Sequence, residues 1–154
     1  MSSGTPRYVV GIDLGTTHSA LAMAKLGDGT GDAAAEHAIV ESFAVPQLVS
    51  ASAVQARELL PSFFYVANAG EGALPLPWDA TRTFAVGAFA RERGVESPGR
   101  VVSSAKSWLS HAGVDRRGAI LPVGAADDVE RISPVEASTR YLRHGIGFRS
   151  RQHK

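Results

Sequence analysis

The sequence predicts an α/β fold that opens with an antiparallel β-meander and continues into a small mixed α/β subdomain. Two apolar runs flank a small polar turn within residues 8–24, which is typical of two strands joined by a tight turn. A further apolar run at residues 37–45 predicts a third strand that closes the meander. Helical spacing after Pro98 and a helix-start signal at Ser133 place helices in the second half of the chain.

Composition limits the classes of protein to which the chain can belong. Its 154 residues have the length of one ordinary domain, and 44% hydrophobic with 20% charged residues is a globular composition. Sixteen basic and fifteen acidic side chains leave a formal charge of +1, so no overall field favours nucleic acid or an anionic membrane surface. The chain has no cysteine, which excludes disulfides, thiolate metal sites and cysteine nucleophiles. Residues 1–7 lack an apolar signal core, and no run is long enough to span a bilayer. We therefore expect a soluble, cytoplasmic protein without nucleic-acid or membrane partners, whose ligand is held by a local site.

The candidate ligand-binding residues in the first half of the chain lie in or beside the polar turn between the first two predicted strands. Gly15 has no Cβ, so a ligand can lie against the backbone, and the N–H groups from Gly15 to His18 can converge on an anion. Thr16 and Thr17 add hydroxyl donors. Asp13 ends an apolar strand and is a candidate magnesium ligand, because magnesium usually keeps its waters and binds through one or two carboxylates plus phosphates. The alternative is an ordinary hairpin in which Asp13 caps its own turn and the threonines are good strand formers.

The middle of the chain predicts short elements separated by loops. Residues 27–32 form a glycine-rich hairpin loop, and residues 46–56 show no clear period. Residues 59–66 predict a strand that Pro61 confines to its start or to a sheet edge. A surface loop is expected over residues 68–80.

Two further segments predict helical structure. Residues 84–94 indicate a short strand, a glycine turn at Gly87 and one helical turn ended by Gly94. Apolar residues recur at helical spacing over residues 101–109 and predict an amphipathic helix with Lys106 at the flank of its apolar stripe. Taken by itself, Lys106 is an ordinary surface lysine whose stem covers apolar neighbours.

A helix-start signal and a basic tail mark the end of the chain. Ser133 is a good N-cap, Pro134 suits the first helical position, and Glu136 completes a capping box. The expected buried face of this helix, which continues to Gly145, consists of Val135, Ser138, Thr139 and Leu142. Residues 145–154 lose periodicity, turn basic and are expected to form a frayed, disordered tail.

The turn sequence GIDLGTTHSALA, residues 11–22, resembles the first phosphate loop of the actin, hexokinase and heat-shock chaperone ATPase superfamily. It is most similar to the N-terminus of the DnaK-type, seventy-kilodalton heat-shock chaperones. Later landmarks follow in the family's order: the Pro61-Ser62 pair, the Val-Gly-x-x-Ala segment that ends at Ala90, the lysine segment at residues 104–109 and the Ser-Pro pair at Ser133. The resemblance implies an incomplete actin-like, ribonuclease H-like ATPase lobe over residues 1–144, with ATP and magnesium as its ligands.

The resemblance also implies roles for particular side chains. Asp13 would hold magnesium through water, and the phosphates would lie against the turn formed by Gly15, Thr16, Thr17 and His18. In the family a lysine in the segment matched by residues 104–109 reaches toward the phosphate that is cleaved. Lys106 and Asp13 are therefore the expected catalytic residues.

Two residues depart from the family pattern. His18 stands where the family's phosphate turn usually has asparagine, and Ser107 stands where arginine usually follows the lysine. Both departures put ordinary catalysis in doubt.

Three functions compete for this pattern. The first is the ATP-binding portion of a DnaK-type chaperone, a stress-response family that couples ATP hydrolysis to protein folding and that binds unfolded polypeptides and co-chaperones in full-length members. The second is a sugar-kinase-like phosphotransferase of the same superfamily, which the order of the landmarks disfavours. The third is a non-catalytic interaction fragment that keeps the shape of the lobe.

Several expected family segments are not found in these 154 residues. They include a second phosphate loop of the Asp-x-Gly-Gly-Gly-Thr kind, an adenine-binding segment and a peptide-binding domain. We expect a truncated or frame-shifted family member that is inactive as an ATPase by itself. An uncovered apolar face and an open sheet edge would also make it prone to self-association.

Overall fold

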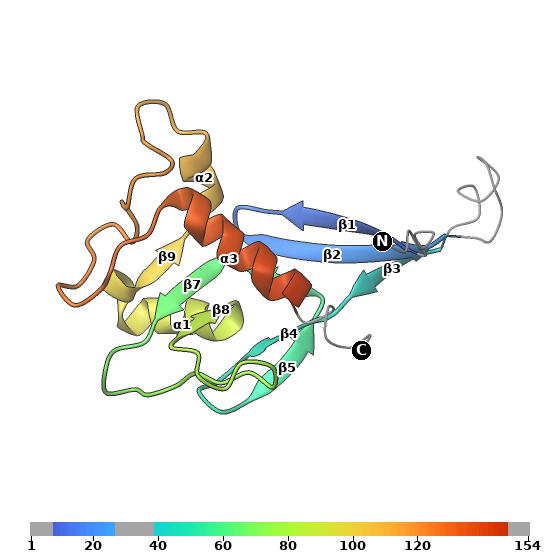
Figure 1. The fold of residues 1–154 in the computed structure, drawn as a ribbon, viewed down its shortest axis with the longest axis horizontal. Coiled ribbons are helices and arrows are strands. Elements are labelled where there is room, and N and C mark those ends of the chain that lie inside the picture. Colours follow the sequence, from blue (N-terminus) through green and yellow to red (C-terminus); the bar gives the residue numbers. More distant parts are fainter. Residues whose placement is uncertain (1–7, 27–38, 148–154) are drawn as a thin grey trace, which may run out of the picture.

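The computed structural model describes residues 8–26 and 39–147. These residues form a mixed α/β structure with antiparallel sheets and three α-helices, as the sequence predicts (Figure 1). Within the described ranges, no helix is long and apolar enough to cross a membrane. The predicted loop at residues 27–32 lies outside the described residues, as does the predicted tail from residue 148 onward. The prediction that the tail begins at Gly145 is wrong, because the last helix continues to Gly147.

The first sheet contains the predicted meander. Strand β1 (Tyr8–Leu14) pairs antiparallel with β2 (His18–Lys25) over its whole length, and β2 pairs on its other side with β3 (Val40–Phe43). The third strand is therefore confirmed but shorter than predicted. A fourth strand, β6 (Leu59–Pro61), pairs with the beginning of β2, so two strands share the second edge of β2.

Strand β1 is exposed along most of its length. Val9, Val10 and Ile12 keep 54%, 46% and 42% of their surface accessible, whereas Leu21 on β2 is buried. Figure 1 shows β1, β2 and β3 extending together from the rest of the molecule. An uncovered apolar strand with an open edge is a surface on which chains can pair, and self-association stays a prediction.

A two-stranded hairpin occupies the stretch in which the sequence shows no clear period. Strand β4 (Val45–Leu48) pairs antiparallel with β5 (Val54–Arg57). All four residues of β4 are buried, so no alternation of apolar and polar residues marks it as a strand. For that reason the sequence shows no clear period here, although the segment forms strands.

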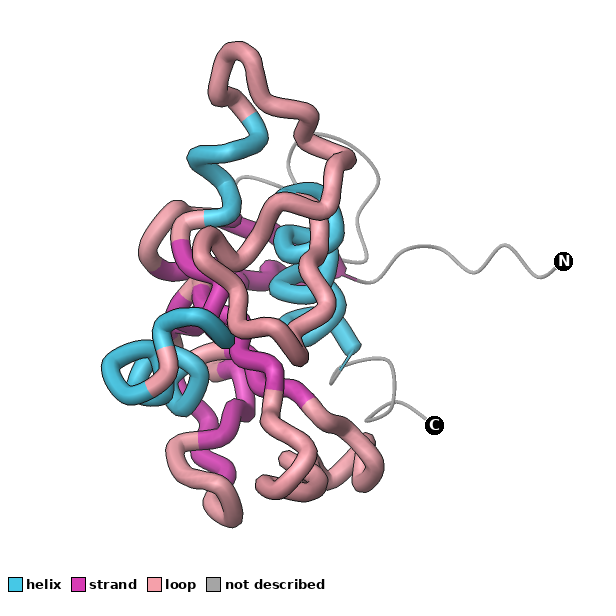
Figure 2. The backbone as a smooth tube through the Cα atoms, turned by 90° about the vertical axis from the view of Figure 1, so that its left-hand side faces the viewer, coloured by secondary structure: helices cyan, strands magenta, loops and turns pink. Residues whose placement is uncertain are grey.

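The third sheet has the order β8-β7-β9 and separates two cores. Its strands are β7 (Phe63–Val66), β8 (Phe84–Val86) and β9 (Val101–Ser103). Helices α1 (Ala88–Glu96) and α3 (Pro134–Gly147) lie on opposite sides of these strands (Figure 2).

Successive side chains of the central strand, β7, point to opposite faces of the sheet, and each helix packs against one of these faces. Phe64 of β7 is buried in one cluster with Ala137 and Tyr141 of α3. The next residue, Tyr65, points to the other face and is buried with Phe89 of α1 and Val101 of β9. Residues 59–66 are thus two strands, β6 and β7, and Pro61 ends the first of them.

The predicted helix over residues 101–109 is wrong in its first half. Val101–Ser103 is strand β9, paired with β7, and a 3₁₀ turn (Pro98–Arg100) precedes it. Ser104 then takes a left-handed conformation with φ of 52°, and only Ala105–Leu109 forms the short helix α2. Pairing with β7 buries Val101 and Val102 and overrides a spacing that also suits a helix.

Helix α1 does not end at Gly94 but continues to Glu96. A Cβ at Gly94 would lie 3.5 Å from Cγ1 of Val101, which is an ordinary packing distance. This glycine faces the neighbouring strand and does not terminate the helix.

Helix α3 begins as predicted and buries a different face. The Ser133 Oγ accepts a hydrogen bond from the Glu136 amide at 3.0 Å, which confirms the N-cap. Glu136 itself accepts a hydrogen bond from Arg140. Of the four residues expected to be buried, only Ser138 is. The buried residues of this helix are Pro134, Ala137, Ser138, Tyr141, His144 and Gly145.

Candidate functional site

The turn between β1 and β2 is tight, because the backbone at Gly15 lies close to the backbone at His18. Leu14 still pairs with Ser19, so only four residues join the paired positions. A Cβ on Gly15 would lie 2.0 Å from the carbonyl oxygen of His18, which no real side chain permits. Gly15 is therefore required by the fold of this turn, whatever ligand it takes.

Ser62 fixes the turn from the neighbouring strand. Its Oγ donates to the Gly15 carbonyl at 2.8 Å, and its amide donates to the Thr17 carbonyl at 2.9 Å. The same hydroxyl lies 3.1 Å from the Ser19 Oγ, and both serines are buried. Sequence reasoning recognised the Pro61-Ser62 pair but not this contact. A serine that ends a buried strand opposite a glycine turn was the available signal.

In this turn the backbone carbonyls of Gly15 and Thr17 are hydrogen-bonded, whereas the backbone amides have no acceptor among the described residues. Over residues 8–26 and 39–147, the amides of Gly15, Thr16 and Thr17 donate no hydrogen bond to a protein acceptor. Thr16 and Thr17 are exposed, and His18 is half-buried as the first residue of β2. The turn thus presents three consecutive donors to solvent and keeps two carbonyls bound to Ser62.

Asp13 lies at the exposed end of β1, opposite Ala20. In the described part of the chain its carboxylate forms no salt bridge and no side-chain hydrogen bond. Because this strand is exposed, water can solvate Asp13 and its carboxylate needs no protein partner. The carboxylate stands one residue from the tight turn and remains available to a cation.

Lys106 lies on α2, away from the turn in sequence but attached to the same core. It is exposed, while its neighbour Ala105 is fully buried. Ala105 belongs to the hydrophobic cluster against which Leu14, next to Asp13, also packs. The structure therefore gathers Asp13 and the turn residues in one place and ties Lys106 to them only through this shared core. No salt bridge joins Lys106 to Asp13 among the described residues.

A second polar cluster is buried beneath α3. Arg82 Nη1 lies 3.1 Å from Nδ1 of His144, and His144 Nε2 lies 3.0 Å from the Pro46 carbonyl. Arginine only donates, so Nδ1 accepts and Nε2 carries the proton that is donated to Pro46. Burial and the nearby guanidinium lower the pKa of His144 to about 3, and burial lowers the pKa of Arg82 to about 10. His144 is thus a neutral imidazole in a fixed tautomer.

Loss of stability in mild acid is expected from His144. Below its ordinary pKa of 6.5 the unfolded chain takes up a proton at this residue and the folded chain does not, so stability falls as pH falls from 6.5 toward 3. The contribution at pH ~5 relative to pH ~8 is about 2 kcal/mol. Urea unfolding at the two pH values measures it.

His144→Gln is the matched variant for this measurement. Glutamine can accept from Arg82 and donate to the Pro46 carbonyl but does not titrate. Its stability should therefore change less between the two pH values. An equal change in both proteins would mean that other groups cause the acid sensitivity.

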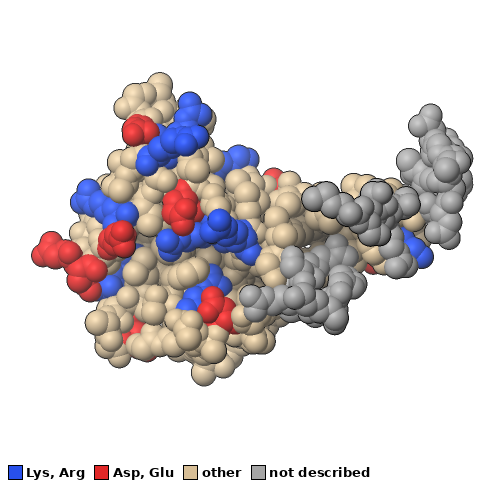
Figure 3. All heavy atoms as spheres, viewed as in Figure 1, with Lys and Arg blue, Asp and Glu red and all other residues tan. Residues whose placement is uncertain are grey.

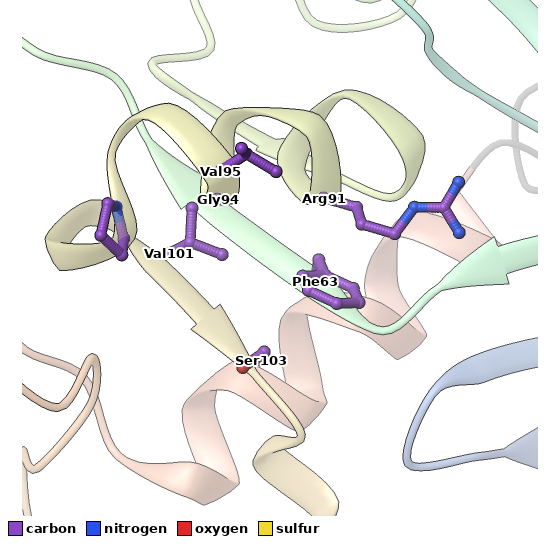
Figure 4. Close-up of a pocket in the computed structure, with 7 residues that line it drawn as sticks. Phe63, Arg91, Gly94, Val95, Val101 and Ser103 are labelled. Carbon is purple, nitrogen blue, oxygen red and sulfur yellow. The ribbon is translucent and has the colours of Figure 1, made fainter.

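A shallow hollow of about 310 Å³ lies between α1 and β9 (Figure 4). Phe63, Val95 and Val101 line it, and Arg91 is its one ionisable residue. The guanidinium of Arg91 extends away from Val101 in this view. With apolar walls and no second charged group, the hollow is a packing groove between helix and sheet and offers no chemistry for phosphate.

No protein-family model matches the chain, and none of the curated proteins compared with it gives a match. The arrangement of the turn, Asp13 and Lys106 is therefore interpreted on its own geometry.

Proposed function

We propose that the chain is the ATP-binding portion of a DnaK-type molecular chaperone, in which the turn after β1 holds the phosphates of a magnesium-nucleotide complex. One observation carries this proposal. The carbonyls of Gly15 and Thr17 are bound to Ser62, whereas the amides of Gly15, Thr16 and Thr17 have no acceptor among the described residues. Phosphate oxygens are the acceptors that such a row of amides suits.

The donor set near the turn fits magnesium. Asp13 contributes a carboxylate, and Thr16 and Thr17 contribute hydroxyls, so every side-chain ligand is a hard oxygen. When bound, magnesium would neutralise charge on the phosphates. Asp13 would hold its water shell, and the turn amides would orient the phosphate oxygens.

On this proposal the sheets and α3 form part of an actin-like lobe, and the family landmarks support it by their positions. Pro61 ends β6 and Ser62 lies between β6 and β7, beside the turn. Gly87 precedes α1, Lys106 lies on α2, and Ser133 caps α3. The exposed ammonium of Lys106 would then stabilise charge on the phosphate that is cleaved. The chain would then take part in ATP-driven protein folding, the activity of this family, which acts on unfolded polypeptides.

The proposal is tested by titrating the ¹⁵N-labelled chain with magnesium-ATP and following amide chemical shifts. Because weak binding still moves these signals, the measurement does not need a complete nucleotide cleft. The amides of Gly15, Thr16 and Thr17 should shift in a saturable way, and removal of magnesium should abolish most of the shift. Asp13→Asn should weaken binding about tenfold, because it removes a charge-assisted contact and leaves the fold intact.

Glu41→Gln is the matched control, since Glu41 is an exposed carboxylate on β3 of the same sheet. It should bind like the unaltered chain. Equal binding by Asp13→Asn, or shifts distributed over the surface without a maximum at the turn, would favour an ordinary hairpin. Enhancement of ATP turnover by a sugar would instead favour the phosphotransferase.

A further inference from the structure

A pocket of about 520 Å³ lies on the opposite part of the molecule from the packing groove, between α3 and the segment that leads into β8. It contains the buried Arg82–His144 pair in its wall. Figure 3 shows basic side chains grouped over α3, with acidic side chains beside them. The charged and aromatic residues that line the pocket are Trp78, Asp79, Arg82, Phe84, Glu136, Arg140, Arg143 and His144.

The charges of the lining do not cancel. Three arginines face two carboxylates, and His144 is neutral. One carboxylate is already engaged, because Arg140 Nε donates to Glu136 at 2.8 Å. Among the described residues neither Arg82 nor Arg143 forms a salt bridge. Asp79 offsets one of these two unpaired arginines, so one positive charge is left over in the pocket.

Arg82 is the unusual member of this group. It keeps only 7% of its surface accessible, and in the described part of the chain its side chain has one hydrogen-bond partner, the neutral imidazole of His144. Its Nε is buried without a partner. No carboxylate within residues 8–26 and 39–147 forms a salt bridge with Arg82, and Asp79, which lines the same pocket, attracts it only from a distance. A buried cation that is only partly balanced is costly unless another anion compensates it. Contact with the Phe84 ring, 3.9 Å from the guanidinium carbon, offsets part of this cost but supplies no negative charge.

Two guanidinium groups are held around one aromatic ring. Arg82 lies over Phe84 at 3.9 Å, and Arg140 lies near the same ring at 5.1 Å. Guanidinium groups fixed by stacking are pre-organised for forked hydrogen bonds to carboxylate or phosphate oxygens. Arg143 adds an exposed third arginine at the pocket.

We propose that this pocket binds a small-molecule oxyanion, a carboxylate or a phosphate, between Arg82, Arg140 and Arg143. Its volume lies in the range of small-ligand sites in proteins. The anion provides the negative charge that Arg82 lacks and lies beside the Trp78 ring. This site is separate from the phosphate turn and does not depend on nucleotide binding there.

Tryptophan fluorescence can report on the pocket directly. The chain has two tryptophans, so the variant Trp108→Phe leaves Trp78 as the sole reporter. This protein is titrated with sodium phosphate in one arm and sodium citrate in the other, against sodium chloride at equal ionic strength. A saturable change with phosphate or citrate that chloride does not produce is the expected result, and the stronger arm identifies the kind of oxyanion.

Three substitutions in this background decide whether the arginines bind the anion. Arg143→Gln changes an exposed side chain and should weaken binding about tenfold, as loss of a charge-assisted contact does. Arg82→Met removes the buried charge and should abolish saturation while the circular dichroism spectrum is retained. Arg91→Gln, at the packing groove, is the matched control and should bind normally. Absence of a saturable change beyond that of chloride, or unchanged affinity in Arg143→Gln, would overturn the proposal even if Arg82→Met fails to fold.

Discussion

Replacing Gly87 with alanine is expected to lower the free energy of unfolding by about 4 kcal/mol. Gly87 has φ of 101° and ψ of −140°, a backbone conformation that side chains rarely adopt. Its Cβ would also lie 2.5 Å from Gln47 Oε1 and 2.8 Å from Leu60 Cδ1. Backbone strain and overpacking each contribute about 1–3 kcal/mol.

The loss is large because Gln47 cannot move freely. Its side chain is completely buried, and its Oε1 accepts a hydrogen bond from the Ala88 amide at 2.9 Å. Its Nε2 donates to the Leu59 carbonyl at 3.0 Å. Displacement of Gln47 by a new methyl group would therefore leave buried donors and acceptors unpaired at the start of α1.

Urea unfolding measures this prediction, with Gly72→Ala as the matched control. Gly72 also has positive φ, 71°, but a Cβ there would meet nothing within 4 Å. It should cost about 1 kcal/mol, the strain of the left-handed conformation alone. Similar losses in the two variants would show that contact with Gln47 and Leu60 contributes little.

Gly15→Ala is expected to abolish the magnesium-ATP chemical shifts at the turn and to lower the free energy of unfolding by about 3 kcal/mol. The new Cβ would lie 2.0 Å from the His18 carbonyl oxygen, so one side of the turn must move. Movement also separates the Gly15 carbonyl from the Ser62 hydroxyl that binds it. The three amide donors would then no longer share one arrangement.

Amide shifts and urea unfolding are measured on the same protein, and Gly11→Ala serves as the control. Gly11 lies in β1, and a Cβ there would have no atom within 4 Å. Alanine at this position should leave both nucleotide shifts and stability close to those of the unaltered chain. If Gly15→Ala still shows the shifts, the tight turn is not what holds the phosphate.

Local signals in the sequence predicted those parts of the fold that depend on neighbours in the chain. The apolar runs around Gly15 gave a hairpin, and Ser133 with its following proline gave the start of α3; both are confirmed. The first depends on two apolar runs separated by a short polar turn, and the second on a hydroxyl three residues from the amide it caps. The residues from Gly15 to His18 were predicted to form one turn for the same reason, because they are adjacent in the sequence.

Features that depend on distant partners could not be predicted in this way. Val101 and Val102 suit a helix by spacing, and only the presence of β7 beside them makes a strand. Which face of α3 is buried is set by packing against Phe64 and Val102 and by the His144 contact with Pro46, almost a hundred residues away in sequence. The contact between Ser62 and Gly15 likewise joins residues 47 positions apart.

Strand β2 changes partner partway along one edge. Its first residues, His18 to Ala20, pair with β6, which belongs to the body of the protein, and Leu21 to Ala24 pair with β3. Leu21 is buried at this junction, while β1 beyond it is exposed. The hairpin is therefore attached to the body of the protein at the end that carries the turn, where β2 pairs with β6. Pairing with β6 fixes the strand beside Gly15, and the outer part of β2 pairs with β1 and β3 alone among the described residues.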